Sequence, residues 1–275
     1  GASASYFNEW KDSVIANKFP NPILDPENDL CRTYKDEEDG LMHFDVERLP
    51  NGTLLEQMKF GIIGLLQPER VLDILQHFIV FERDNGKIIK KVARYQQLRA
   101  ANKIVERVTH TDKKQGVIWH TQGSGKSLTM LYTAYKLRKA EELDDPTIFI
   151  VVDRKDLKDQ MGDTFLDCVF PNARQVMSVG DLKSIIKDKP AGVFITTIQK
   201  FNELGSIVDD RDNVIVLIDE AHRTEYGDYQ MELQAVLPNA KRFAFTGTPI
   251  PKTHREFGIK DENGKIEYYL DKYSV

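Results

Sequence analysis

The stretch that decides the fold is Gly116–Ser127, which reads GVIWHTQGSGKS. It opens with a short apolar run typical of a buried strand, and apolar residues recur at helical spacing after Ser127. A glycine-containing loop therefore joins a strand to the N-terminus of a helix. At such a junction, converging backbone N–H groups and the positive end of the helix dipole favour phosphate binding.

The residue types of this loop suit the parts of a nucleoside triphosphate. We expect the loop to surround the phosphates with backbone N–H groups, and the residues concerned are Thr121, Gly123, Ser124 and Gly125. The Lys126 ammonium group would reach the β- and γ-phosphates, while the Ser127 hydroxyl would coordinate Mg²⁺. The strict pattern begins with glycine where this chain has His120, and GSGKS alone also occurs in ordinary loops.

A second stretch, Val214–Glu220, supplies the acidic half of such a site. Its β-branched run predicts a central parallel strand, and carboxylates at the C-terminal end of such a strand face the ligand crevice. Asp219 would hold Mg²⁺, and Glu220 would act on the water that attacks the γ-phosphate. An isolated Asp-Glu pair is more often a solvated helix cap. The glycine loop and the acidic strand together favour a catalytic nucleotide site.

Short apolar strands alternate with helical patterns over the rest of the C-terminal part of the chain. The predicted strands are 117–119, 148–152, 176–179, 193–195, 214–218 and 243–245. This alternation predicts crossover connections and a parallel sheet with helices on both faces. With the glycine loop and the acidic strand, residues 91–275 are therefore predicted to form an α/β domain with a RecA-like P-loop NTPase fold.

Residues 1–90 read as a smaller, loop-rich and helical connecting segment before that domain. Residues 17–52 are rich in Pro, Asn and Asp, whereas residues 54–66 have a helical pattern and Pro68 suits the start of a further helix. Asp84–Gly86 predicts a hairpin turn between two apolar runs.

The composition narrows the possible classes of protein. With 275 residues, of which 41 % are hydrophobic, the chain can build a buried core, but its apolar runs are too short to span a bilayer. The net charge of −5 differs from the basic charge typical of DNA-binding domains, so any contact with DNA would involve only a small part of the surface. The two cysteines, Cys31 and Cys168, lack metal-ligand spacing and form no disulfide framework, which agrees with a reducing compartment. We therefore expect a cytoplasmic protein without membrane contact.

Further motifs resemble those of superfamily-two helicases and translocases. Asp219–His222 is the DEAH form of their acidic motif, and Thr246–Pro249 resembles their third motif. The resemblance implies that His222, Thr246 and Thr248 couple ATP hydrolysis to movement.

Two other segments, Asp153–Gln160 and Thr197–Phe201, occupy the places where this class contacts the nucleic-acid backbone. The resemblance implies DNA contacts from Arg154, Thr197 and Lys200. For Arg154 a solvated helix face is an equally good interpretation.

Arg94–Ala100 resembles the glutamine motif with which this class reads adenine. Within it, Gln97 has the better spacing to Ala100. The resemblance therefore implies ATP as the nucleotide and Gln97 as the residue that contacts its base.

Within this class, the sequence resembles one family in particular, the restriction subunit of type I restriction-modification enzymes. The segments that carry this resemblance are 120–127, 151–154, 197–201, 219–224 and 245–250, with flanking similarity at 66–73, 78–82 and 270–274. That family carries histidine at the position of His120. The resemblance implies an ATP-dependent translocase that pulls duplex DNA before distant cleavage, with methyltransferase (M) and specificity (S) subunits as partners.

Neither a convincing nuclease motif nor a second motor lobe is recognisable, and Glu9-Trp10-Lys11 matches part of a nuclease motif by chance. We therefore expect a fragment that holds the first motor lobe. Two alternatives stay open. A helicase of another superfamily-two branch would unwind strands in a displacement assay, and a non-catalytic scaffold module would bind ATP without turnover.

Overall fold

The structure is a computed structural model of the 275-residue chain. It describes residues 14–15, 32–35, 42–45, 68–84, 86–153, 161–165, 168, 170, 172–219, 226–249, 251, 253, 257–260 and 266–273. The chain divides into two compact units, Gly1–Gln76 and His77–Val275. The predicted helix at 54–66 lies outside the described residues, as do Arg154, Glu220 and His222.

The first unit contains a small antiparallel sheet of order β1-β3-β2. Its strands are β1 (Val14–Ile15), β2 (Arg32–Lys35) and β3 (Met42–Asp45). Helix α3 (Pro68–His77) begins at Pro68, as predicted, because proline has the helical φ and lacks an N–H group that the first turn could not use.

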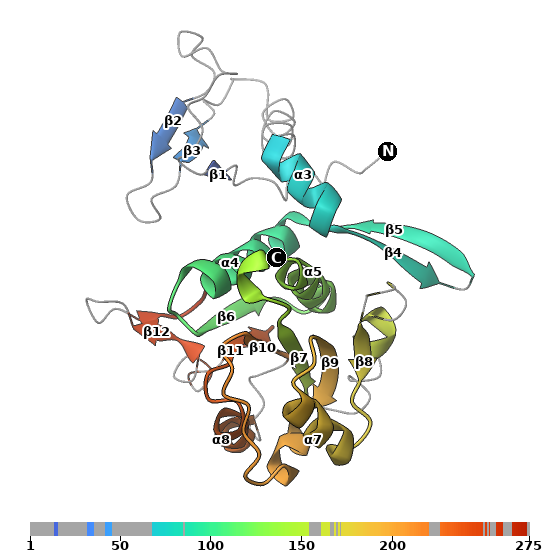
Figure 1. The fold of residues 1–275 in the computed structure, drawn as a ribbon. Coiled ribbons are helices and arrows are strands. Elements are labelled where there is room, and N and C mark those ends of the chain that lie inside the picture. The colour runs from blue at the N-terminus through green and yellow to red at the C-terminus, as the bar shows by residue number, and fades with distance from the viewer. Residues whose placement is uncertain are drawn as a thin grey trace. The chain divides into compact units, whose positions relative to one another are not determined.

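The second unit is built on a seven-stranded sheet of order β14-β6-β11-β10-β7-β9-β8, in which every pairing is parallel (Figure 1). Its strands are β6 (Gln115–His120), β7 (Thr147–Val152), β8 (Ala173–Gln175), β9 (Gly192–Thr197), β10 (Val214–Asp219), β11 (Lys241–Thr246) and β14 (Asp271–Tyr273). The predicted RecA-like P-loop NTPase fold is confirmed.

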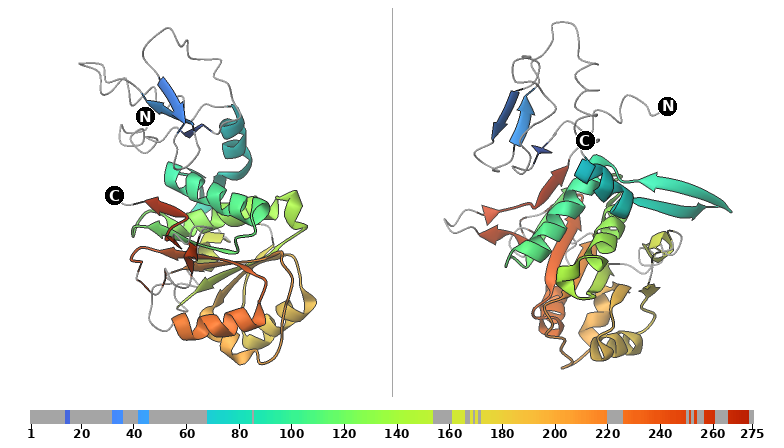
Figure 2. Two further views of the ribbon diagram at one scale, coloured as in Figure 1. Left: turned by 90° about the vertical axis from the view of Figure 1, so that its left-hand side faces the viewer. Right: turned by 45° about the horizontal axis from the view of Figure 1, so that its top comes forward.

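Helices cover both faces of this sheet, as the two further views make plain (Figure 2). Helices α4 (Tyr95–His110) and α5 (Lys126–Arg138) lie on one face, and α7 (Val179–Asp188) and α8 (Tyr226–Val236) lie on the other. Two short 3₁₀ helices, η1 (Glu141–Leu143) and η2 (Ile198–Glu203), connect elements of the sheet layer. Among the described residues, no helix combines the length and the apolar character needed to cross a bilayer.

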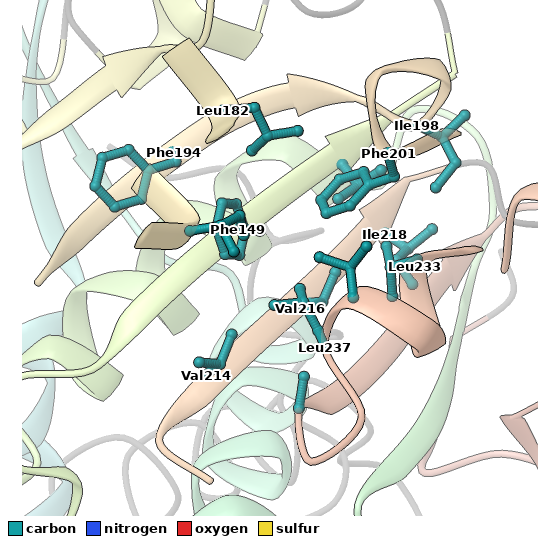
Figure 3. Packing of buried hydrophobic residues seen from close by; sticks show 14 of the residues in the cluster. Phe149, Leu182, Phe194, Ile198, Phe201, Val214, Val216, Ile218, Leu233 and Leu237 are labelled. Carbon is teal, nitrogen blue, oxygen red and sulfur yellow. The ribbon is translucent and has the colours of Figure 1, made fainter. Parts of the chain in front are cut away.

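The core explains why the central strands read as continuous apolar runs. Every residue of β7, β9 and β10 is buried, since helices cover both faces of the sheet. On the α7 and α8 face, the Phe149 and Phe201 rings pack with their centroids 6.0 Å apart, next to Leu182 and Leu233 (Figure 3). This packing fixes the sheet whose edge carries the predicted site.

Two strands differ from the sequence-based expectation. The structure has β8 at Ala173–Gln175 rather than a strand at 176–179, because Ser178 starts α7: its Oγ accepts a hydrogen bond of 3.1 Å from the Asp181 N–H. Strand β14 was not predicted, since its three residues lack a period-2 apolar pattern. It nevertheless pairs with β6 and extends the sheet beside the glycine loop.

The predicted hairpin is confirmed as β4 (Ile79–Asp84) and β5 (Lys87–Val92). It packs on α5, where the Tyr132 hydroxyl donates a 3.4 Å hydrogen bond to the Lys91 carbonyl. The hairpin therefore belongs to the second compact unit, which begins at His77. The domain division after residue 90 stays a proposal. Strands β12 (Ile259–Lys260) and β13 (Ile266–Glu267) form a further small hairpin.

Candidate nucleotide-binding site

The glycine loop joins β6 directly to α5, as the sequence predicts. Gly123 and Gly125 both have a φ of +82°, in the left-handed region that favours glycine. At Gly125, the residue before α5, an added Cβ would lie only 2.4 Å from the Gln97 Nε2 atom. The left-handed backbone therefore favours glycine here, and a larger residue would displace the buried Gln97 side chain.

The loop contains buried polar atoms that no other described residue pairs. The Thr121 Oγ1 and Ser124 Oγ atoms are buried and have no hydrogen-bond partner among the described residues. Buried hydroxyls are normally paired, so two unpaired ones in a single loop indicate a polar ligand. Phosphate oxygens are suitable acceptors, and this loop is therefore the best-supported phosphate site in the described part of the chain.

Gln97 lies against the loop rather than apart from it. The side chain is 2 % exposed, and its Nε2 atom donates to the carbonyl oxygens of Ser124 and Gly125 at 3.5 and 3.2 Å. Its Oε1 atom accepts a 2.8 Å hydrogen bond from the Arg94 N–H at the start of α4. Gln97 thus braces the phosphate loop. Its predicted contact with adenine stays a proposal.

The acidic strand ends at the same edge of the sheet as the loop. Asp219 is the last residue of β10, is 7 % exposed and is in register with Phe245. Thr246 follows in β11 and is in register with Trp119, one residue before the end of β6. Because all of these strands are parallel, their carboxyl ends converge at the loop.

The Thr246–Thr248 segment packs directly on the phosphate loop. A Cβ added to Gly247 would lie 3.4 Å from the Gln122 nitrogen and 3.6 Å from the Lys126 Nζ atom. The Trp119 indole N–H donates a 3.1 Å hydrogen bond to the Gly247 carbonyl. We did not predict this role of Trp119 from the sequence, where the only signal was an aromatic residue ending an aliphatic run.

The residues expected to hold Mg²⁺ are Ser127, in the first turn of α5, and Asp219. The described residues bring together no group of three His, Cys, Asp or Glu side chains that could bind a metal by themselves. Mg²⁺ typically takes one or two protein ligands and completes its shell with phosphate oxygens and water. The donor set therefore fits a nucleotide-bound Mg²⁺ ion.

Two of the predicted DNA-contacting residues come together at the end of β9. Thr197 is 7 % exposed, and its Oγ1 atom accepts a 3.3 Å hydrogen bond from the Lys200 Nζ atom in η2. The Gln199 side chain donates to the Asp153 carbonyl at 2.8 Å, which ties η2 to the end of β7. Asp153, the described first residue of one segment expected to contact DNA, thus meets the other segment at the carboxyl ends of neighbouring strands.

A buried ionic cluster beside the loop was missed by the sequence analysis. The Asp271 carboxylate accepts hydrogen bonds from Arg99 Nε at 2.7 Å and His120 Nε2 at 2.8 Å, and Lys103 Nζ lies 3.3 Å away. Burial by itself raises the pKa of Asp271, but the hydrogen bonds and positive charges around it lower this pKa to about 2. Asp271 is therefore ionised at neutral pH.

A parallel sheet with a glycine loop and an acidic strand at its carboxyl ends defines a P-loop ATPase domain. Residues 96–275 match the sequence model of the SWI2/SNF2 ATPase family, and the chain belongs to that family.

Its relatives include endonuclease subunits of type I restriction enzymes, so the resemblance stated from the motifs is confirmed. The HindI endonuclease subunit of Haemophilus influenzae is 39 % identical over 258 residues, covering 84 % of this chain and 23 % of the relative. The putative MjaIXP endonuclease subunit of Methanocaldococcus jannaschii is 36 % identical over 224 residues, covering 77 % and 21 %. The chain thus spans less than a quarter of the length of these relatives.

The UvsW helicase from bacteriophage T4 resembles the chain with a TM-score of 0.45 and 19 % identity, over 66 % of this chain and 61 % of the helicase.

Proposed function

We propose that the chain is the ATP-binding first motor lobe of a type I restriction endonuclease subunit, which hydrolyses ATP to pull duplex DNA. The observation that carries the proposal is the convergence at one sheet edge of the glycine loop, Asp219 and the Thr246–Thr248 segment. The unpaired hydroxyls of Thr121 and Ser124 support a bound phosphate there. The names of the relatives support the restriction context.

Each loop residue has a defined part in this proposal. Backbone N–H groups of Gly123 and Gly125 and the hydroxyls of Thr121 and Ser124 bind the phosphates. The Lys126 ammonium group neutralises charge on the β- and γ-phosphates. Ser127 and Asp219 hold Mg²⁺, which when bound compensates phosphate charge. Gln97 contacts adenine in addition to bracing the loop.

Hydrolysis and its coupling to movement depend on residues that follow the two central strands. Glu220 orients the attacking water, and His222, Thr246 and Thr248 pass the change at the γ-phosphate to the rest of the motor. The Thr248 N–H donates a 3.1 Å hydrogen bond to Thr246 Oγ1, which supports a defined conformation for this segment.

Duplex DNA is the proposed substrate of the movement. Arg154, Thr197 and Lys200 contact its phosphates, a sequence-independent interaction that weakens as salt is added. The methyltransferase and specificity subunits are the proposed partners, and the cytoplasm is the proposed location.

Nucleotide binding by the chain tests the proposal. Titration with Mg-ATP should give saturable binding that Lys126→Ala greatly weakens. Lys114→Ala is the matched control, because Lys114 lies before β6 and its Nζ atom is hydrogen-bonded to Asn239 at 3.3 Å. Equal binding by both variants would show that this loop is not the phosphate-binding loop.

A further inference from the structure

The ionic cluster around Asp271 connects three elements at the start of the phosphate loop. Asp271 lies on β14, His120 is the last residue of β6, and Arg99 belongs to α4. The Asp271 side chain and the His120 side chain are both fully buried. Such a cluster requires each charge to be paired, because an unpaired buried charge is strongly unfavourable.

The hydrogen bonds fix the orientation of His120. An ionised carboxylate only accepts hydrogen bonds, so the Nε2 atom of His120 carries the hydrogen in its 2.8 Å contact with Asp271. Arg99 binds the same carboxylate through Nε and a terminal nitrogen, at 2.7 and 3.2 Å, and also donates to the Lys272 carbonyl at 2.7 Å. The guanidinium group thus fixes both the carboxylate and the backbone of β14.

Strand β14 in turn holds the first residue of the loop. The Thr121 N–H donates a 3.2 Å hydrogen bond to the Tyr273 carbonyl, which continues the pairing of β14 with β6 beyond His120. At the other end of the loop, Gln97 donates to the carbonyls of Ser124 and Gly125. Gln97 and Arg99 belong to the same part of α4, so this helix braces both ends of the phosphate loop.

We propose that Asp271 is a positioning residue for nucleotide binding, which acts through His120 and Arg99 to hold the start of the phosphate loop in its binding conformation before ATP arrives. The proposal rests on the proposed ATP-binding function. Without this clamp, the loop must be ordered when the nucleotide binds. That ordering weakens ATP and ADP alike, since both need the same loop for their phosphates.

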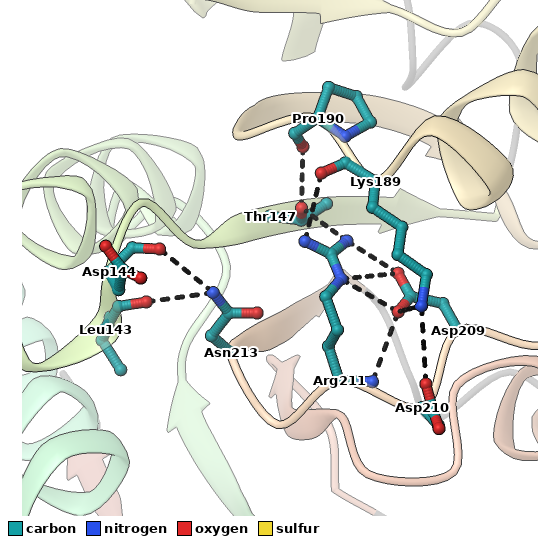
Figure 4. A network of polar contacts seen from close by, with 9 residues as sticks. All are labelled: Leu143, Asp144, Thr147, Lys189, Pro190, Asp209, Asp210, Arg211 and Asn213. Atoms are coloured by element: carbon teal, nitrogen blue, oxygen red, sulfur yellow. Dashed lines mark hydrogen bonds and ion pairs between the residues drawn. The ribbon is translucent and has the colours of Figure 1, made fainter.

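A second buried carboxylate provides a matched control. Asp209 is 1 % exposed, its Oδ2 atom lies 2.7 Å from Arg211, and its Oδ1 atom lies 3.6 Å from Lys189. Arg211 also donates to Thr147, the first residue of β7, which places this cluster at the amino ends of the strands (Figure 4). It resembles the Asp271 cluster in chemistry but has no contact with the loop among the described residues.

The experiment compares Asp271→Asn with Asp209→Asn in the 275-residue chain. Dissociation constants for Mg-ATP and Mg-ADP are measured by titration with a fluorescent nucleotide, at a temperature at which thermal unfolding shows every variant to be folded. We expect Asp271→Asn to raise both constants roughly 10-fold. Asp209→Asn should lower the unfolding temperature and leave both constants unchanged. Unchanged constants in Asp271→Asn would overturn the positioning role.

Arg99→Gln provides a second route if Asp271→Asn fails to fold, because Arg99 is partly exposed and its loss leaves His120 and Lys103 on the carboxylate. We expect Arg99→Gln to raise both dissociation constants as well, and Arg99→Lys to give values between those of Arg99→Gln and the wild type. Wild-type affinity in Arg99→Gln would overturn the proposal. Absence of nucleotide binding in the wild-type chain would instead overturn the proposed function, and this role with it.

Discussion

At the amino ends of the parallel strands, buried polar side chains pair with one another, whereas at the carboxyl ends some have no hydrogen-bond partner within the described part of the chain. Thr147, at the amino edge, donates to the Pro190 carbonyl at 2.7 Å and accepts from Arg211 at 3.0 Å. The Asn213 side chain donates to the carbonyls of Leu143 and Asp144, in the turn before β7 (Figure 4). At the carboxyl edge, Thr121 and Ser124 keep buried hydroxyls without a hydrogen-bond partner among the described residues.

The difference separates polar groups that stabilise the fold from polar groups that await a ligand. An unmade hydrogen bond to a buried hydroxyl costs about 1–3 kcal/mol, so the paired groups of the amino edge contribute stability. The hydroxyls of the carboxyl edge that lack a partner among the described residues are unfavourable in the free protein, and the proposed phosphate would pair them. Substitutions at the carboxyl edge therefore test this difference, in order of decreasing expected effect.

The largest effect is expected at Glu220. Glu220→Gln in the full-length subunit should lower ATP turnover about 1000-fold and leave ATP binding intact, because the carboxylate acts on water rather than on the nucleotide. Steady-state ATPase and nucleotide titration measure the two effects. Glu232→Gln, an exposed carboxylate of α8, is the control. Normal turnover in Glu220→Gln would assign the catalytic base to another residue.

Lys126→Ala should weaken Mg-ATP binding by about 100-fold, the loss expected for a charge-assisted contact with phosphate. The unfolding temperature should change little, since Lys126 is only half-buried, in the first turn of α5. Titration measures the loss of Mg-ATP affinity, and thermal unfolding of the same sample measures any loss of stability. A large loss of stability would show that this lysine supports the fold rather than the ligand.

Acid should reveal how strongly Asp271 contributes to stability. Its folded-state pKa of about 2 lies below the ordinary value of 3.8, so its contribution is complete above about pH 4 and is lost as the pH falls towards 2. This difference corresponds to about 2 kcal/mol. Denaturant unfolding at pH 6 and pH 3 should therefore show a smaller acid loss in Asp271→Asn than in the wild type. Equal losses of stability in the two proteins would show that Asp271 is not held ionised by its partners in the folded state.

The smallest effect concerns the loop backbone. Gly125→Ala should strain the left-handed conformation by about 1–2 kcal/mol, displace Gln97 and lower ATP affinity about 10-fold. Gly86→Ala is the control, since its φ of +77° imposes similar strain but nothing lies within 4 Å of an added Cβ. Titration should show reduced affinity in Gly125→Ala alone. Equal affinity in the two variants would limit the importance of the Gln97 contact.

The sequence was sufficient for the central strands of the sheet because they are buried on both faces, whereas the edge strand β8 was misplaced and the edge strand β14 was missed. An unbroken apolar run such as that of β10 has no other common explanation beside a phosphate loop. The acidic residue at its end could be assigned for the same reason, since the carboxyl ends of parallel strands meet at one edge.

The rest of the site depends on contacts between distant residues, which no local pattern encodes. His120 and Asp271 are 151 positions apart, and β14 is a strand only because it pairs with β6. The Trp119 contact with Gly247 and the Gln97 contact with Gly125 are of the same kind. The chemical roles of the motif residues stay predictions from the sequence, and the packing that positions these residues became visible only in the folded chain.

Hydrogen exchange with and without Mg-ATP tests the central claim most directly, because it locates the ligand on one edge of the sheet. We expect nucleotide to slow amide hydrogen exchange at residues 121–127 and around Gln97, and to leave exchange unchanged at residues 143–147 and 209–213 of the amino edge. Protection confined to the amino edge, or no protection anywhere at saturating nucleotide, would contradict this claim.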